Sequence, residues 1–430
     1  MNITIQHGRL IDPANGIDTH TDLHIAEGVI AGVGEAPNGF EADSHINAEG
    51  KIVCPGLVDL RARLREPGGE SRATIASETA AAAAAGITTL ACPPDPSQPI
   101  DTPALVDLIR HRAKQSGHCR VLPLGALTQG LAGQQLAEMR TLKQAGCIGV
   151  SNGLQAVEST AVMRRAMEYA ASQGLTVFLH AEDPWLAAGG CAHEGAVSVR
   201  LGLTGIPEAA ETIAVARELQ LIEQTGVRAH FCHLSTARAV RMIARARYDG
   251  LPVSADVAAH QLYLTDMDIG YFDTQCHVRP PLRSQRDREG LREGLKQGTI
   301  NAICSDHQPH GADAKLAPFP ASEPGISGLE TLLPLSLRLA DEGLLSLSEA
   351  IARVTRYPAE ILGLLESGEA GSLSVGARAD VCVFDPEPYW ELRAEALVSS
   401  GHNSPFLGWE LKGRVDCTLM AGELTYHTCD

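Results

Sequence analysis

The 430-residue sequence is poor in aromatic residues and in long apolar stretches. Aromatic side chains make up 4% of the chain and hydrophobic residues 44%, so we expect a large, mainly aliphatic core. No apolar run approaches the roughly 18 residues of a membrane-spanning helix. The opening MNITIQHGRLID alternates like a strand and lacks the basic and apolar regions of a leader. We therefore expect a cytoplasmic protein without a membrane partner.

The cysteines and the charges exclude further classes of protein. Eleven cysteines are scattered singly, and the nearest two are Cys417 and Cys429, so zinc ribbons and CxxC redox motifs are excluded. Such cysteines are typical of a reducing compartment, where they act as small buried hydrophobes. Lys and Arg number 35 against 52 Asp and Glu, a net charge of −17, which disfavours nucleic acid as a partner.

Short apolar runs alternate with helical patterns along most of the chain, which predicts a parallel sheet. The runs cover residues 56–60, 88–92, 121–126, 147–151, 176–180, 228–233, 253–257 and 300–305. Helical segments cover residues 74–85, 103–115, 134–145, 160–172, 208–225, 237–248 and 287–297, with further ones at 329–341, 346–356 and 358–365. Eight such units predict an α/β fold of the (β/α)8 TIM-like barrel type, with a doubly wound sheet as the alternative.

The two ends of the chain do not follow this rhythm. Residues 1–50 and 371–430 have short alternating strands and turns, and we expect them to pair into one small composite β-domain beside a barrel of residues 51–370. The loop 311–324 is rich in helix and strand breakers and is a candidate mobile lid.

In a barrel of this type the functional groups follow the carboxyl ends of the strands. The first predicted strand leads into Arg61 and Arg63, the fifth and sixth end in His180 and His233, and the eighth leads into Asp306. These side chains are therefore expected to meet at one rim.

The motifs at this rim and elsewhere resemble those of dihydroorotases, which belong to the amidohydrolase superfamily. The similarity runs almost from end to end, and its motifs are PGLVDL, LREPG, HAED, HLST, PPLR, SDHQPH, GISGLET, GSLSVGARADVCVFD and GHNSPFLG. The resemblance implies a metal-dependent barrel with a composite β-domain, which agrees with the strand count.

The resemblance also implies a zinc centre with a His-x-His pair, an Asp, two further His and a catalytic Asp. The corresponding positions in this chain are Arg61, Arg63, Asn152, His180, His233 and Asp306. A guanidinium has no lone pair for a metal and stays protonated. An Arg about 4 Å from a divalent cation would add repulsion of about 8 kcal/mol at an effective dielectric of 20. We therefore expect no metal and no cofactor, and only a remnant of the catalytic residue in Asp306.

The positions that contact substrate in the family are also altered. Arg65 and His310 match the family residues, but Asp95 replaces an Asn and would repel a substrate carboxylate. Arg279, which replaces a second Asn, is bulky and charged. These four residues are therefore interpreted as a vestigial substrate site.

The residues of the rim should then satisfy one another. We expect Arg61 and Arg63 to pair with Asp306 and Asp95, because a buried carboxylate without a partner is costly. His180 and His233 are expected to be satisfied core histidines.

Other polar residues near the rim have more ordinary interpretations. Arg65 could pair with Glu66 or Asp183, or keep an anion-binding role. His307 and His310 could be rim packing or residual ligand contacts, and Lys315 in the loop is expected to be solvated. The cysteines next to the strands, Cys92, Cys232 and Cys304, are expected to fill the core.

The resemblance extends to the non-catalytic, dihydroorotase-like chain of bacterial aspartate carbamoyltransferase. It implies a pseudoenzyme that scaffolds or regulates the catalytic chains of that transferase in pyrimidine biosynthesis, with homodimer contacts as well. One alternative is an active amidohydrolase with a rearranged metal centre, in which Asp306 is the general base and an arginine stabilises the oxyanion. Another is a sensor that binds a carboxylated pyrimidine through Arg65 without turnover.

Overall fold

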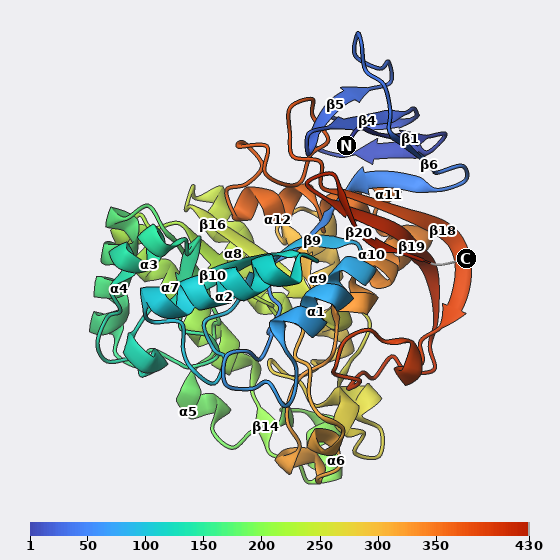
Figure 1. The fold of residues 1–430 in the computed structure, drawn as a ribbon. Coiled ribbons are helices and arrows are strands. Elements are labelled where there is room, and N and C mark those ends of the chain that lie inside the picture. Colours follow the sequence, from blue (N-terminus) through green and yellow to red (C-terminus); the bar gives the residue numbers. More distant parts are fainter. Residues whose placement is uncertain (429–430) are drawn as a thin grey trace.

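Eight parallel strands form the centre of the molecule in the computed structural model, which describes residues 1–428 (Figure 1). They are β8 (Leu57–Asp59), β9 (Ile87–Cys92), β10 (Arg120–Ala126), β11 (Gly149–Ser151), β12 (Thr176–Leu179), β15 (Ala229–Phe231), β16 (Val253–Ala258) and β17 (Ala302–Cys304). Each strand pairs with the next along the chain. The bridge between Ala62 and His307 joins the two edges of the sheet. The predicted barrel is confirmed, because a doubly wound sheet would reverse its strand order.

The helices around the barrel lie close to the predicted segments. They are α1 (Ile75–Ala84), α2 (Pro103–Ser116), α3 (Met139–Ala145), α4 (Thr160–Ser172), α7 (Glu208–Thr225), α8 (Ala237–Tyr248), α9 (Gln285–Lys296), α10 (Leu332–Asp341), α11 (Leu347–Ala352) and α12 (Arg356–Ile361). The side chain of Thr74 accepts a hydrogen bond from the backbone N–H of Ser77 and caps α1. Gly86 follows the helix with φ +80°, where a β-carbon would lie 2.5 Å from Cys382 Sγ.

One insertion in the barrel was not predicted. Between β12 and α7 the chain forms α5 (Pro184–Ala187), α6 (Ala196–Leu201), and the two-residue strands β13 (Ala192–His193) and β14 (Gly205–Ile206). These pieces are too short to show a periodic apolar pattern.

The composite β-domain contains two sheets. Its four-stranded sheet consists of β1 (Ile3–Gln6), β4 (Leu23–Ala26), β5 (Val29–Val33) and β6 (Ser44–Asn47). Its six-stranded sheet consists of β2 (Arg9–Asp12), β3 (Ile17–His20), β7 (Ile52–Pro55), β18 (Val381–Glu391), β19 (Glu410–Met420) and β20 (Glu423–His427).

Strand β7 connects the two ends of the chain. It pairs in parallel with β2 and antiparallel with β18, and it lies just past the expected boundary at residue 50. Residues from both ends share one core cluster, which includes Ile5, Leu23, Val381 and Leu419. The strands from the amino and carboxyl ends lie side by side in Figure 1 (blue and red).

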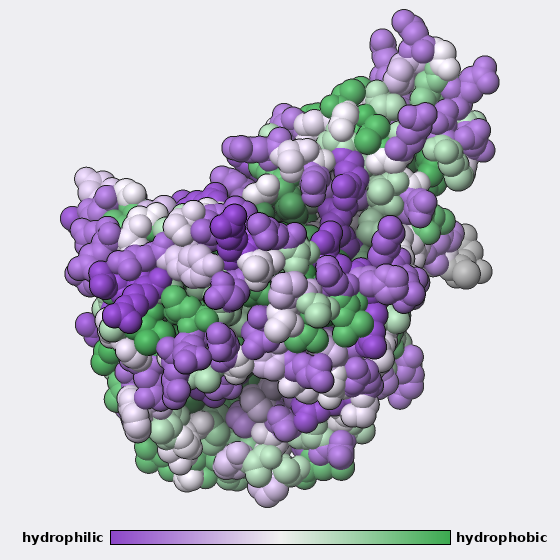
Figure 2. All heavy atoms as spheres, turned by 60° about the vertical axis from the view of Figure 1, so that its left-hand side comes forward, coloured by the Kyte–Doolittle hydropathy of each residue, from purple (hydrophilic) through white to green (hydrophobic). Residues whose placement is uncertain are grey.

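The surface and the core agree with the composition. Hydrophilic residues dominate the face shown in Figure 2, and hydrophobic patches are scattered between them. The ten cysteines of the described part are all buried, as expected for Cys92, Cys232 and Cys304, whereas Cys429 lies outside it. Among residues 1–428 no helix combines the length and the apolarity needed to cross a membrane.

Candidate functional site at the carboxyl end of the barrel

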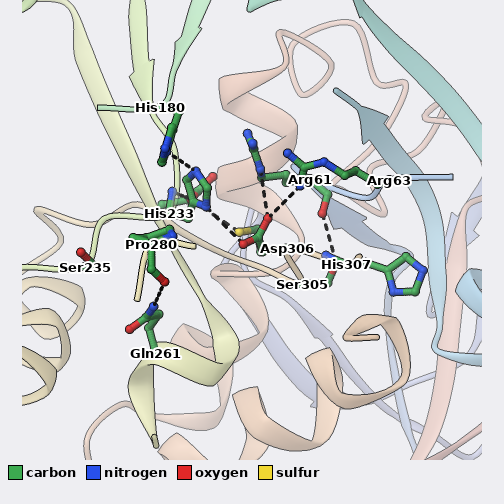
Figure 3. A network of polar contacts seen from close by, with 12 residues as sticks. Arg61, Arg63, His180, His233, Ser235, Gln261, Pro280, Ser305, Asp306 and His307 are labelled. Carbon is green, nitrogen blue, oxygen red and sulfur yellow. Dashed lines mark hydrogen bonds and ion pairs between the residues drawn. The ribbon is translucent and has the colours of Figure 1, made fainter. Parts of the chain in front are cut away.

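Two buried arginines meet Asp306 at the carboxyl end of the strands (Figure 3). The Arg61 Nε atom lies 3.0 Å from Asp306 Oδ1, and Arg63 Nη1 lies 3.5 Å from the same oxygen. Arg63 also binds the Asp95 carboxylate through Nε and Nη2, at 3.0 and 2.7 Å. These are the ion pairs expected from the sequence, because the buried carboxylates of Asp95 and Asp306 need cationic partners.

The second oxygen of Asp306 leads into a pair of histidines. His233 Nδ1 lies 3.2 Å from Asp306 Oδ2, and His233 Nε2 lies 3.0 Å from His180 Nδ1. His233 is therefore satisfied on both ring nitrogens, as expected. His180 is not, because its buried Nε2 has no hydrogen-bond partner among the described residues and lies 3.8 Å from Glu182 Oε2.

Arg279 does not point at the arginine–aspartate cluster but binds Glu182. Its Nε lies 2.9 Å from Glu182 Oε1, and its Nη2 contacts the same oxygen. Glu182 is a site residue that sequence reasoning missed, although it is the third residue of the HAED motif. It neutralises Arg279 at the edge of the network.

Asn152 does not join the network either. Its side-chain oxygen accepts a 2.6 Å hydrogen bond from Thr128 Oγ1, and its amide nitrogen donates to the carbonyls of Leu131 and Gln155. All three contacts lie within the loops that follow β10 and β11. Asn152 therefore stabilises these loops.

The cluster carries no net charge, because two guanidiniums face the two carboxylates of Asp95 and Asp306. Burial opposes ionisation of Asp306, but the contact with His233 and the cations Arg61 and Arg63 hold the pKa of this carboxyl well below its usual range. Burial and Arg61 lower the pKa of His233 to about 4. His233 is therefore neutral at pH 7 and donates its Nδ1 proton to Asp306.

The backbone at this rim is strained. Arg65, His233 and Asp306 are three of the eight non-glycine residues in the described chain with positive φ, at 62°, 39° and 43°. Such conformations cluster at functional sites. The backbone N–H of His233 donates to Asp256 Oδ1, which makes buried Asp256 a second supporting residue that sequence reasoning missed.

These residues do not fit the zinc centre that the resemblance implies. Both ring nitrogens of His233 and both oxygens of Asp306 are engaged within the network. The buried guanidinium of Arg61 stands beside them, and its Nη2 has no hydrogen-bond partner in the described chain. A divalent cation beside Arg61 would meet repulsion of about 8 kcal/mol at 4 Å and an effective dielectric of 20.

A second buried group lies on the neighbouring strands β15 and β16. His230, Cys232 and Asp256 form the one set of side chains with metal-ligand spacing that residues 1–428 contain. His230 Nε2 already lies 2.9 Å from Asp256 Oδ2, and burial raises the pKa of the Cys232 thiol. The histidine and the aspartate thus satisfy each other as a core pair.

Arg65 is unusual because it forms no ion pair with an acid in the described chain. Its Nε donates to the Pro309 carbonyl at 2.9 Å, and its Nη2 lies 3.1 Å from His310 Nε2. Burial and the neighbouring Arg63 lower the pKa of Arg65 to about 10. The predicted pairing with Glu66 or Asp183 is wrong, because Glu66 binds Arg112 and Asp183 caps α5.

The remaining predictions for this rim have mixed outcomes. Lys315 is not solvated: it is buried, and Nζ donates to the carbonyls of His277 and Glu323 at 3.2 and 2.7 Å. The bond to His277 ties the loop 311–324 to the segment before α9, and the bond to Glu323 closes the loop on itself. His307 has a packing role, since its Nε2 lies 2.7 Å from Glu78 Oε2 and its Nδ1 accepts from the Gly328 N–H.

Comparison with known proteins agrees with the motifs and with the fold. A family model described as dihydro-orotase-like matches residues 50–239, and one for the amidohydrolase family matches residues 324–426. The chain is 50% identical to a dihydroorotase-like protein of Pseudomonas aeruginosa, over 99% of this chain and 100% of that protein. It is 45% identical to a dihydroorotase of Geobacter sp. (strain M21), over 99% of both.

The solved structures give the same architecture. The L-hydantoinase (dihydropyrimidinase) of Arthrobacter aurescens superposes with a TM-score of 0.88 at 25% identity, over 100% of this chain and 96% of that one. With full-length relatives at such identity, the chain belongs to the dihydroorotase-like family of amidohydrolases.

Proposed function

We propose that this chain is a non-catalytic dihydroorotase-like subunit that scaffolds or regulates aspartate carbamoyltransferase in pyrimidine biosynthesis. The observation that carries the proposal is the ion-pair cluster of Arg61, Arg63 and Asp306, three positions at which the resemblance implies metal-centre residues. Fixed internal cations neutralise the carboxylate there in place of a metal.

The cluster also makes Asp306 a poor general base. An efficient base has a pKa near the working pH, whereas the two arginines hold the Asp306 pKa far below that range. Both carboxylate oxygens already accept hydrogen bonds from fixed donors, so a water at Asp306 would compete with Arg61 and His233. His233 cannot take over this role without breaking its bond to His180 or to Asp306.

The altered substrate positions support the same proposal. Asp95 binds Arg63 and Arg279 binds Glu182, so both are tied into internal pairs. The partner follows from the resemblance to the non-catalytic chain of aspartate carbamoyltransferase. The Pseudomonas aeruginosa and Pseudomonas putida relatives, at 50% and 49% identity, are both named dihydroorotase-like protein.

An active amidohydrolase with a rearranged centre is the second candidate. It is favoured by the names of relatives such as the Geobacter dihydroorotase at 45% identity. The strained backbone of His233 and Asp306 is also what a working site would keep.

A ligand-binding role without turnover is the third candidate, and Arg65 favours it. Its partly buried guanidinium forms no ion pair in the described chain, which leaves it able to bind the carboxylate of a pyrimidine. Calorimetry with dihydroorotate tests this role. The wild type is expected to bind dihydroorotate without forming product, and Arg65→Met is expected to abolish the binding.

Two measurements separate the first two candidates. Protein purified without chelators is expected to contain no stoichiometric zinc and to leave dihydroorotate unchanged. Stoichiometric zinc together with turnover that Asp306→Asn abolishes would refute the non-catalytic assignment. Failure of the chain to co-elute with the aspartate carbamoyltransferase of the same cell would refute the scaffold role alone.

A further inference from the structure

A cavity of about 650 Å³ lies between the barrel and the β-domain. One wall is the exposed face of α2 together with Arg120 and Val121 at the start of β10, and the other is Arg378 and the turn between β19 and β20. Asp306 follows the carboxyl end of its strand, so this cavity lies at the opposite end of the barrel. Its volume is in the range of about 300–1,000 Å³ that small-molecule sites occupy.

The cavity is basic although the chain is strongly acidic. Four of the 35 Lys and Arg residues line it, namely Arg110, Lys114, Arg120 and Arg378, together with His111. Two acids, Asp107 and Glu423, are also present. The lining therefore carries a positive excess within a chain whose formal net charge is −17, and such a concave patch concentrates anions.

Two of these cations are fixed and two are free. Arg120 lies 2.8 Å from Asp380 Oδ2, and Arg110 donates to the Ala145 carbonyl at 2.7 Å. By contrast, the side chains of Lys114 and Arg378 form no hydrogen bond or ion pair within residues 1–428. They come from different domains and line the same cavity, so an anion in it is attracted by cations from both domains.

The cavity also offers an apolar surface. Val121 and Ala113 on the barrel side and Met420 on the β-domain side line it beside the cations. A ligand with an anionic group and a less polar body would therefore be matched at both ends.

We propose that this junction cavity binds a small molecule that carries a phosphate or diphosphate group. Phosphate oxygens accept several charge-assisted hydrogen bonds at once, which suits a guanidinium and an ammonium whose side chains form no ion pair in the described chain. Binding would bridge the β-domain and the barrel, independently of any activity at the rim around Asp306.

Titration of the full-length chain with inorganic pyrophosphate at low ionic strength tests the proposal. We expect saturable binding of one pyrophosphate per chain, which weakens as salt is added. The charge reversals Lys114→Glu and Arg378→Glu together are expected to weaken binding by about tenfold or more, because two charge-assisted contacts are lost. The milder pair Lys114→Gln and Arg378→Gln is expected to weaken it in the same direction.

A matched control separates the site from the overall charge. Arg238 and Arg241 are exposed on α8, and their side chains form no hydrogen bond or ion pair within the described chain. Reversing both changes the net charge as much as the Lys114 and Arg378 pair does, and binding is expected to stay within about twofold. An equal loss in the control would overturn the proposal, as would the absence of saturable binding. Binding to phosphatidic acid vesicles without binding of free pyrophosphate would also overturn it, in favour of a lipid surface.

Discussion

Replacing Arg61 by methionine is expected to destabilise the barrel by about 3–5 kcal/mol at pH 7, because it leaves a buried carboxylate without its nearest cation. The side chains of Arg61 and Asp306 are each only 2% exposed, so solvent screens the pair very little. After the substitution the remaining cation, Arg63 Nη1, lies 3.5 Å from Asp306 Oδ1 and is shared with Asp95. Methionine keeps most of the side-chain volume of arginine, so the loss of stability is due to the missing charge and not to a cavity.

The assay is urea unfolding followed by far-UV circular dichroism at several pH values. In the wild type, the lowered Asp306 pKa stabilises the fold above the pKa of an unfolded Asp, and this stabilisation decreases as the pH falls below about 4. In Arg61→Met, burial is opposed only by Arg63 and by the hydrogen bond with His233, so the Asp306 pKa rises. The destabilisation should therefore be smaller at pH 5 than at pH 8.

A double-mutant cycle provides the control. Arg61→Met combined with Asp306→Asn removes both charges and is expected to recover at least half of the lost stability, since a buried pair and its neutral replacement are often similar in stability. Two results would refute the pairing with Asp306 as the reason that Arg61 is tolerated in the core. One is a double variant whose loss of unfolding free energy equals the sum of the two single losses, and the other is an Arg61→Met protein as stable as the wild type.

Three further outcomes are expected from the structure. Restoring the family's metal ligands with Arg61→His, Arg63→His and Asn152→Asp should give no robust dihydroorotate turnover, because the substrate positions stay tied into ion pairs; turnover at the level of an active family member would contradict this. Burial and a nearby arginine lower the pKa of His310 to about 3. The free energy of unfolding of the wild type should therefore fall as the pH drops from about 6.5 to 4. His310→Gln should reduce the slope of this fall by up to about 1.4 kcal/mol per pH unit. Lys315→Met removes two hydrogen bonds to backbone carbonyls, so amides of the loop 311–324 should exchange faster, and unchanged exchange would show that the loop is held by other contacts.

The barrel could be predicted from the sequence because each central strand is buried on both faces. Such strands appear as continuous apolar runs, and the 3.6-residue pattern of the helices separates them. The insertion between β12 and α7 could not be predicted, since elements of two to six residues have no measurable period. The division of the β-domain into two sheets could not be predicted either, because alternation predicts strands but not which strands pair.

Some contacts of the candidate site could likewise be predicted from the sequence, and others could not. The pairs of Arg61 and Arg63 with Asp306 and Asp95 could be predicted, because strand ends converge at one rim and buried charges need partners. The partner of Arg279 is 97 residues away, and no pattern of spacing connects it with Glu182. Lys315 was expected to be solvated because its loop is polar, but it binds backbone carbonyls, which the sequence does not reveal.

The zinc content of the full-length chain, purified without chelators and measured by mass spectrometry, tests the central claim most directly. An internal pair of arginines in place of the metal predicts less than about a tenth of an equivalent per chain, even after incubation with excess zinc and dialysis. One or two tightly bound zinc ions per chain, lost in Asp306→Asn, would contradict it.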